Sequence, residues 1–444
     1  MDDFYIDKQT SVDLQLLETG NSSVFACFNQ TVTSGGEDAL RELFRKPLTN
    51  PDLLQQRRTT IRFLMDRMTE LPLDKTMVDF LDYYLKSPER PVSFSVSQAM
   101  RNVVKFYFSP NQAFYAKRRG IAEMAETLIF IKQLGETYPE GNTIPLLANL
   151  QESLHKLTRH PLLARLVDDP DRRLTRYAME QIDFLLRKEH HHDTLILLNQ
   201  LYFLDAYYSI ASASRARGFI FPSFHETERL TLEGVYHPLL DNPVTNHVML
   251  DGERRVNFIT GANMSGKSTL MKAVGIAVYL AHLGFPVPAS RMNTCILDGL
   301  MTTINLADNI NDGYSHFYSE VKRVKLVAEQ INQSDRLLVI FDELFRGTNV
   351  KDAYDGSLRI IQALSELNNG FFMVSTHIVE VAQALATHAK ISFNYLRTNV
   401  DGERPVFDYQ LRSGITDDRI GLWILQNEGV FELLAAKNSG AKAD

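Results

Sequence analysis

The stretch Gly261-Ala-Asn-Met-Ser-Gly-Lys-Ser-Thr269 decides the fold predicted for this 444-residue chain. It fits the pattern G-x-x-x-x-G-K-[ST], in which glycines let the backbone approach a polyphosphate and aim N–H groups at it. The preceding Arg255–Thr260 reads as a short strand, and Ser268–Leu283 reads as a helix rich in Ala, Leu and Val. Strand, glycine loop and helix N-terminus together predict a phosphate-binding P-loop. The alternative is a surface Gly/Ser turn before a helix.

Each residue type in this loop suits a complex of ATP with Mg²⁺. Lys267 would reach the β- and γ-phosphates, and the Ser268 hydroxyl would ligate Mg²⁺. The residues expected to line the nucleotide are Gly261, Ala262, Asn263, Met264, Ser265, Gly266, Lys267, Ser268 and Thr269.

Two later segments predict the rest of a catalytic site. Leu337–Phe341 is a continuous apolar run, typical of a parallel strand buried on both faces, and it ends in Asp342-Glu343. We expect Asp342 to hold the Mg²⁺ shell and Glu343 to polarise the attacking water. A second such strand ends at Thr376-His377, and parallel strands present their ligands at their carboxyl ends. His377 is therefore interpreted as a γ-phosphate sensor, with a structural histidine as the alternative.

Composition sets broad limits. The apolar fraction of 44% and the charged fraction of 23% are those of a globular protein, and the net charge of −7 does not indicate a basic nucleic-acid binder. Cys27 and Cys295 are too few for a disulfide framework or a zinc site. The start of the chain lacks signal-peptide features, and no segment reads as a membrane span, so a cytoplasmic location is expected.

Local basic clusters could still contact DNA, although a solvated helix face is the alternative for each. His190–His192 is interpreted as a polar helix segment and not a metal site, because adjacent helical residues point to different faces. The basic clusters are Lys117–Arg119, Arg172 and Arg173 with Arg176, and Arg215 with Arg217.

The chain divides into two predicted domains. Residues 1–228 read as helices, and residues 229–444 alternate strands with helices, which indicates a parallel-rich α/β sheet. Two short helices are predicted at the end of the chain, at Asp417–Asn427 and Val430–Ala436.

The string Thr33–Glu37 resembles the signature loop of ABC transporters, but it precedes the glycine loop and is discounted. Ser315 is placed to cap a helix whose apolar residues share one face.

With these motifs, the chain resembles the MutS family of DNA mismatch-repair ATPases. Asn263 and Met264 match the family's Gly-Pro-Asn-Met-Gly-Gly-Lys-Ser-Thr, with Ala262 and Ser265 as departures. The remaining similarities run through both predicted domains, over roughly 15–68 and 230–435. They are Thr31–Leu40, Pro47-Leu48, Arg57, Glu233–Pro238, Ser315, Phe317, Glu320, Asp342-Glu343, Arg346–Thr348, Thr376-His377, Tyr409–Gly414 and Gly421-Leu422.

The resemblance implies an ABC-type P-loop ATPase domain preceded by an all-α core and lever. It also implies a homodimer through the ATPase domain, with a helical dimerisation segment near 415–440. Ser315 and Glu320 would then face the nucleotide of the partner protomer. Val244 stands where the family has an adenine-stacking aromatic, and we expect it to line the nucleotide site with Asn246.

The departures shape the functional prediction. The chain begins almost directly at the core domain, so a short MutS-like protein without the mismatch-recognition and connector domains is expected. The family's mismatch wedge carries a Phe-x-Glu motif. Outside the ATPase half of this chain, the only similar string is Phe224–Glu226, on the domain boundary. Three functions stay open: an ATP-dependent DNA-binding ATPase, a mechanical or scaffolding ATPase whose lever binds a protein partner, and a catalytically silent dimer module.

Overall fold

The computed structural model describes residues 4–17, 22–88, 112–170, 173–304, 316–401, 404–416, 425–431 and 433–434. These residues form two compact units. Unit 1 comprises Met1–Cys27, Pro47–Pro51 and Gly218–Asp444, and unit 2 comprises Phe28–Lys46 and Asp52–Arg217. The N-terminal 27 residues thus belong to the unit that holds the sheets, whereas the sequence placed them in the helical domain.

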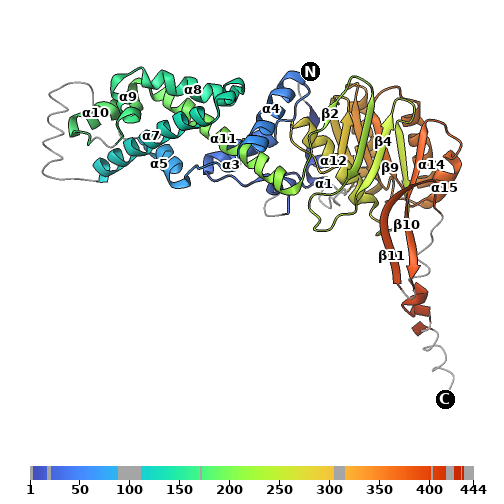
Figure 1. Cartoon of the computed structure of the whole chain (residues 1–444). Helices are drawn as coiled ribbons and strands as arrows, with labels where there is room; N and C mark the ends of the chain where they lie inside the picture. The colour runs from blue at the N-terminus through green and yellow to red at the C-terminus, as the bar shows by residue number, and fades with distance from the viewer. Residues whose placement is uncertain are drawn as a thin grey trace, which may run out of the picture. The chain divides into compact units, whose positions relative to one another are not determined.

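Unit 1 is built on a seven-stranded sheet in the order β1-β7-β8-β9-β5-β10-β11 (Figure 1). All neighbouring strands are parallel except β10 and β11, which pair antiparallel, so the predicted mixed fold with a parallel-rich sheet is confirmed. The strands are β1 (Tyr5–Ile6), β5 (Val256–Thr260), β7 (Gly299–Thr303), β8 (Leu337–Asp342), β9 (Phe371–Ser375), β10 (Ile391–Asp401) and β11 (Arg404–Ser413).

Helices cover both faces of this sheet because its central strands are buried on both sides. In β8, alternate side chains point to opposite faces. Val339 and Phe341 pack in the core with α13 (His316–Ile331), α14 (Val350–Glu366) and α15 (Val379–Leu385). Ile340 instead lies against Gly275 of α12 (Lys267–His282).

A second, four-stranded sheet in unit 1 has the order β2-β6-β3-β4. The N-terminal segment adds two short helices, α1 (Lys8–Asp13) and α2 (Val24–Phe28). The strands of the second sheet are β2 (Ser223–Phe224), β3 (Arg229–Val235), β4 (Asn246–Asp251) and β6 (Arg291–Thr294).

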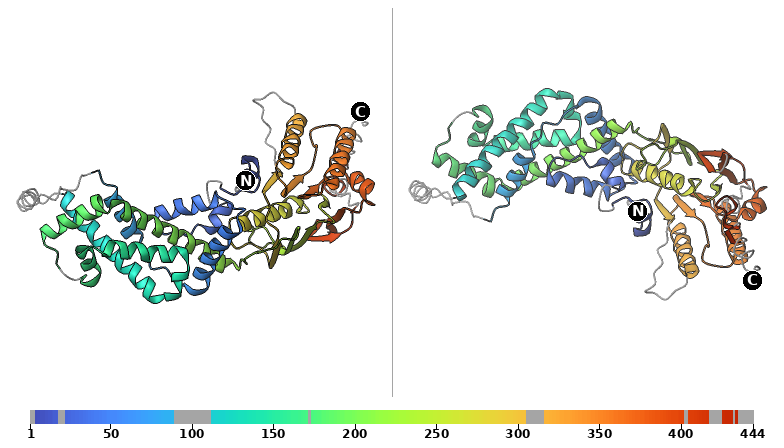
Figure 2. Two further views of the ribbon diagram at one scale, coloured as in Figure 1. Left: turned by 90° about the horizontal axis from the view of Figure 1, so that it is seen from above. Right: turned by 90° about the horizontal axis from the view of Figure 1, so that it is seen from below.

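The described part of unit 2 is helical, and its helices run alongside one another (Figures 1 and 2). The 27-residue α11 contacts α3, α5 and α8. The elements are α3 (Ser34–Phe44), α4 (Pro51–Arg67, whose first residue belongs to unit 1), α5 (Lys75–Leu85), α7 (Gln112–Thr137), η1 (Pro139–Thr143), α8 (Pro145–Thr158), α9 (Pro161–Asp168), α10 (Arg176–Phe184), the π-helix η2 (Leu185–Glu189) and α11 (His191–Arg217).

The glycines at the start of α3 have a structural role. A Cβ on Gly35 would lie 2.3 Å from the Tyr202 ring, and one on Gly36 would lie 2.1 Å from the Asp205 carboxylate. The buried Asp205 accepts hydrogen bonds from the Thr33 amide at 2.8 Å and the Thr33 hydroxyl at 2.7 Å. The Thr33 hydroxyl caps α3 by accepting from the Gly36 amide, and the Asp205 carboxylate on α11 holds Thr33 in place, while the glycines let the two helices meet.

None of the helices in the described residues has both the length and the hydropathy needed to cross a membrane. The expected C-terminal helices lie mostly outside the described residues, which include only short helical pieces at 425–431 and 433–434.

Candidate nucleotide site

The loop between β5 and α12 adopts a backbone that requires glycine at two positions. Gly261 has φ of 144° and Gly266 has φ of 98°, both in the region that L side chains rarely adopt. A Cβ on Gly261 would lie 2.9 Å from the Leu396 carbonyl oxygen, and one on Gly266 would lie 3.0 Å from the Tyr409 ring. Since α12 begins at Lys267, the loop opens onto the N-terminus of a 16-residue helix.

Lys267 folds back over this loop. Its Nζ donates hydrogen bonds to the carbonyl oxygens of Gly261 at 2.8 Å and Ala262 at 3.0 Å, and the residue is 5% exposed. Burial lowers the pKa of Lys267, while the carboxylates of Glu343 and Asp342 act in the opposite direction. An anionic ligand bound near Nζ would replace the two carbonyl dipoles with a full negative charge. It would therefore raise the pKa of Lys267 and stabilise its ammonium form.

Asp342, at the end of β8, has the properties of a metal ligand. Its Oδ1 accepts a hydrogen bond from the Ser375 hydroxyl, whereas its Oδ2 is buried and has no hydrogen-bond partner among the described residues. The buried Ser265 hydroxyl is also without a partner there. Buried carboxylate oxygens are rarely left unsatisfied, so Oδ2 fits a role in the shell of a hard divalent cation such as Mg²⁺. Within the described residues, no three Asp, Glu, His or Cys side chains are grouped so that they could hold a metal ion.

Glu343 lies beside Asp342 in a left-handed conformation, with φ of 58°. Its backbone N–H donates to the Ser375 carbonyl at 3.1 Å, which ties the residue to β9. Its Oε2 lies 2.6 Å from Arg346 Nε and 3.9 Å from His377 Nδ1. The His377 side chain is 48% exposed, which does not fit a satisfied core histidine and keeps it available to a ligand.

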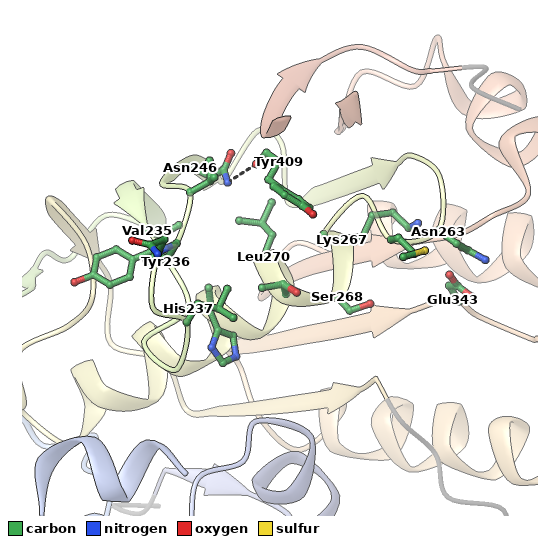
Figure 3. Close-up of a pocket in the computed structure, with 18 of the residues that line it drawn as sticks. Val235, Tyr236, His237, Asn246, Asn263, Lys267, Ser268, Leu270, Glu343 and Tyr409 are labelled. Atoms are coloured by element: carbon green, nitrogen blue, oxygen red, sulfur yellow. Dashed lines mark hydrogen bonds between the residues drawn. The ribbon is translucent and has the colours of Figure 1, made fainter. Parts of the chain in front are cut away.

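Lys267, Ser268, Glu343 and Arg346 line one cavity of about 650 Å³, whereas Gly261, Asp342 and His377 are not among its lining residues. Figure 3 shows Lys267, Ser268 and Glu343 close together, with Tyr409 between them and Asn246. The cavity is lined by Val235, Tyr236, His237, Leu240, Asn242, Pro243, Val244, Asn246, Asn263, Met264, Gly266, Lys267, Ser268, Thr269, Leu270, Ala273, Glu343, Arg346 and Tyr409. A volume of this size suits a ligand of drug or nucleotide size.

Tyr409 also lines this cavity, and no sequence motif predicts it there. It has φ of 54°, and its ring stacks on Phe407 with centroids 6.0 Å apart and lies against Gly266. The expected lining residues Val244 and Asn246 share the cavity with it. The Asn246 amide, however, is committed to β11: it donates to the Tyr409 carbonyl at 2.9 Å and accepts from the Leu411 amide at 2.7 Å.

Of the two residues expected at the partner's nucleotide, Ser315 lies outside the described residues. The Glu320 carboxylate is buried within its own chain. It accepts hydrogen bonds from the backbone amides of Arg346 at 3.1 Å and Gly347 at 3.3 Å.

Comparison with known proteins agrees with this geometry. A family model described as MutS domain V matches residues 257–440. The chain is 29% identical over 228 residues to a DNA mismatch repair protein MutS of Clostridioides difficile, a match that covers 50% of this chain and 24% of that protein. It is 28% identical over 229 residues to a MutS of a Geobacillus species, with coverages of 50% and 26%.

A eukaryotic relative matches the chain to a similar extent. The chain is 31% identical over 239 residues to the DNA mismatch repair protein spellchecker 1 of Drosophila melanogaster, which covers 52% of this chain and 26% of that protein. The chain thus spans about a quarter of the length of the curated relatives it matches.

Proposed function

Because the chain belongs to the MutS family, we propose that it is an ATP-dependent DNA-binding ATPase, working as a homodimeric ABC-type switch in DNA repair or recombination. The observation that carries the proposal is the convergence of Lys267, Ser268 and Glu343 on one cavity, with Asp342 at the end of the adjacent strand. The same convergence speaks against the silent-module alternative, because the groups needed for hydrolysis are present.

In the proposed reaction, the glycine loop and the N-terminus of α12 bind the phosphates of ATP as a P-loop. Lys267 exchanges its carbonyl partners for the β- and γ-phosphates, and Glu343 polarises the attacking water. His377, exposed beside Glu343, senses the γ-phosphate. These roles place charge opposite the charge that develops as the phosphoryl group is transferred.

The oxygen groups of Ser268 and Asp342 suit Mg²⁺. Ser268 would bind it directly and the unpartnered Asp342 Oδ2 would hold its shell. When bound, the ion neutralises phosphate charge and orients the γ-phosphate.

The aromatic Tyr409 supports binding of a nucleobase. Val244 offers only a small apolar surface, and Tyr409 lines the same cavity with an aromatic ring. We propose that the base stacks on Tyr409, since base–aromatic stacking tolerates any purine or pyrimidine face.

Any DNA binding by unit 2 would depend on its few clusters of basic side chains, because the net charge of the whole chain is −7. Several of the basic residues considered for it are used internally. Lys117 pairs with Glu180 at 2.9 Å, and Arg215 donates to the carbonyls of Leu64 and Met68 at the end of α4. The Arg176 guanidinium lies over the Phe114 ring.

This internal use of cations favours a second candidate, in which unit 2 acts as a lever that binds a protein partner. A salt series separates the two. If DNA is the ligand, log K falls linearly with log[salt], with a slope set by the number of phosphates contacted.

The test of the proposal measures phosphate release with Mg²⁺ and ATP, together with affinity for duplex, mismatch, four-way junction and single-stranded DNA, each with and without ATP. Hydrolysis together with salt-sensitive, ATP-dependent DNA binding is expected. Hydrolysis without DNA affinity would favour the protein-binding lever, and absence of hydrolysis by the wild-type chain would overturn the proposal.

A further inference from the structure

The loop that follows β8 carries two residues in the left-handed backbone region, and neither is glycine. Glu343 has φ of 58° and Phe345 has φ of 62°. Such conformations persist only where the surrounding structure holds them in place. The contacts that hold residues 343–347 are therefore informative about what this loop does.

One end of the loop is fixed by β9 and the other by α13. The Glu343 amide donates to the Ser375 carbonyl at 3.1 Å and to its hydroxyl oxygen at 3.2 Å. Glu320, 6% exposed, accepts from the amides of Arg346 at 3.1 Å and Gly347 at 3.3 Å, one on each carboxylate oxygen. An ionised carboxylate strengthens both bonds relative to a neutral acceptor.

Phe345 anchors the middle of the loop. It is buried, and its ring makes an edge-to-face contact with Phe317, with centroids 5.5 Å apart. On the other side it lies against α14, where a Cβ on Gly356 would be 3.0 Å from the ring. The ring thus fills a space between α13 and α14 that a smaller side chain would leave empty.

Both α13 contacts come from the same helix face, because Phe317 and Glu320 are three residues apart. The next residue on that face, Arg323, is 7% exposed and ties α13 to the rest of unit 1. It donates to the Thr302 carbonyl at 2.6 Å at the end of β7 and pairs with Asp7 of the N-terminal segment. Helix α13 and the loop 343–347 are therefore held as one body.

We propose that Glu320 and Phe345 are positioning residues that lock the 343–347 loop to α13, so that α13 sets where the Glu343 carboxylate stands. This inference rests on the proposed ATPase function, because it concerns the group assigned to polarise water. Movement of α13 would then be transmitted to Glu343 through two amide hydrogen bonds and one aromatic contact.

The test compares Glu320→Gln and Phe345→Leu with Glu329→Gln, a matched control on the same helix, where Glu329 is 53% exposed and pairs only at 3.7 Å with Lys325. Both test variants are expected to lower kcat at least about tenfold, because a misplacement of ~1 Å can cost ~10²-fold. The Kd for a non-hydrolysable ATP analogue should change less than about threefold, and the control should match wild type.

Two further measurements separate positioning from general damage. In a Glu343→Gln background, adding Glu320→Gln should cause no further loss of rate, since residues that act through one another are not additive. Hydrogen exchange of the 343–347 amides should be faster in Glu320→Gln than in Glu329→Gln. Unchanged kcat, an additive double variant or unchanged exchange would each overturn the inference. The hydrogen-exchange measurement does not require hydrolysis. If the wild-type chain has no activity, the ATPase proposal is refuted, but hydrogen exchange still decides whether Glu320 holds the loop.

Discussion

Asn246 on β4 holds Tyr409 on β11 by its backbone: the Asn246 amide donates to the Tyr409 carbonyl at 2.9 Å, across 163 positions of sequence. The Asn246 side chain also accepts a hydrogen bond from the Leu411 amide. Together the two bonds keep Tyr409 at φ of 54° and its ring at the cavity. The pair therefore connects the β4 edge to the place where we propose that a nucleobase stacks.

The first prediction concerns this ring. Tyr409→Ala should weaken ATP binding about tenfold, or ~1.4 kcal/mol, within the ~1–3 kcal/mol that a base–aromatic stack contributes. Tyr409→Phe should bind like wild type. Equilibrium titration with a fluorescent ATP analogue measures the effect, and inorganic tripolyphosphate, which has no base, should bind both variants equally. Tyr115→Ala, an exposed tyrosine of unit 2, is the control. Equal losses for ATP and tripolyphosphate would show that Tyr409 supports the loop and not the base.

The second prediction separates two ways of stopping hydrolysis. Lys267→Ala should abolish activity and weaken ATP binding, because Lys267 supplies charge to the bound nucleotide as well as to the transition state. Glu343→Gln should keep ATP bound while turnover falls by ~10²–10³ or more, a typical size for acid–base or electrostatic contributions. Single-turnover kinetics and filter retention of labelled ATP measure both. Turnover near the wild-type rate in Glu343→Gln would refute the role assigned to Glu343.

Sequence alone could predict the centre of this site and not its rim. Gly261–Thr269 and Asp342-Glu343 lie in contiguous motifs at the ends of strands, so local pattern was sufficient to predict them. Tyr409 depends on how the β10–β11 pair folds back beside β4, which no local period encodes. The two-residue strand β1 is too short to show a period, and its place beside β7 depends on partners nearly 300 positions away.

The third prediction is acid sensitivity of unit 1 through His282. The imidazole is fully buried, its Nδ1 lies 2.9 Å from the Leu48 carbonyl, and its Nε2 accepts the Leu297 amide at 3.3 Å. A proton on Nε2 would face that amide N–H, and burial lowers the pKa of His282 to about 4. The unfolded chain binds the proton near 6.5, so the neutral folded state is fully favoured above pH 6.5 and loses stability as pH falls towards 4.

This histidine contributes roughly 3 kcal/mol to the pH dependence between those limits. The measurement is Tm against pH for wild type and for His282→Gln, which can offer an amide donor and an oxygen acceptor at the same place. The wild-type curve should fall more steeply between pH 6.5 and 4, and His388→Gln, at a partly exposed histidine, is the control. Parallel curves for wild type and His282→Gln would contradict the assignment.

The fourth prediction is that this 444-residue chain does not discriminate mismatches. Phe224, in its Phe-x-Glu string, packs against the buried His282 ring with centroids 5.7 Å apart, so it is not free to act as a wedge in DNA. Affinities for homoduplex and for a duplex with one mismatch should agree within error at one salt concentration. A tenfold preference for the mismatch, ~1.4 kcal/mol, would reveal a reader elsewhere in the chain.

The last prediction is that each ATP site is shared across a homodimer. By resemblance, Ser315 of one protomer would face Lys267, Asp342 and Glu343 of the other, so that the γ-phosphate joins the protomers and hydrolysis loosens them. A helix N-terminus is suited to this role because it attracts anions. The test mixes two inactive variants, Lys267→Ala and Ser315→Arg.

A heterodimer of these variants contains one site with both lesions and one site with both residues intact, because Lys267 and Ser315 of a site come from different protomers. Mixing should therefore restore activity that neither variant has alone, up to half of the wild-type value per heterodimer if sites act independently. Mass spectrometry of differently tagged chains confirms that subunits exchange. If the exchanged mixture stays inactive, Ser315 and Lys267 serve the same protomer's site, and the switch would have to work without nucleotide shared between the two copies.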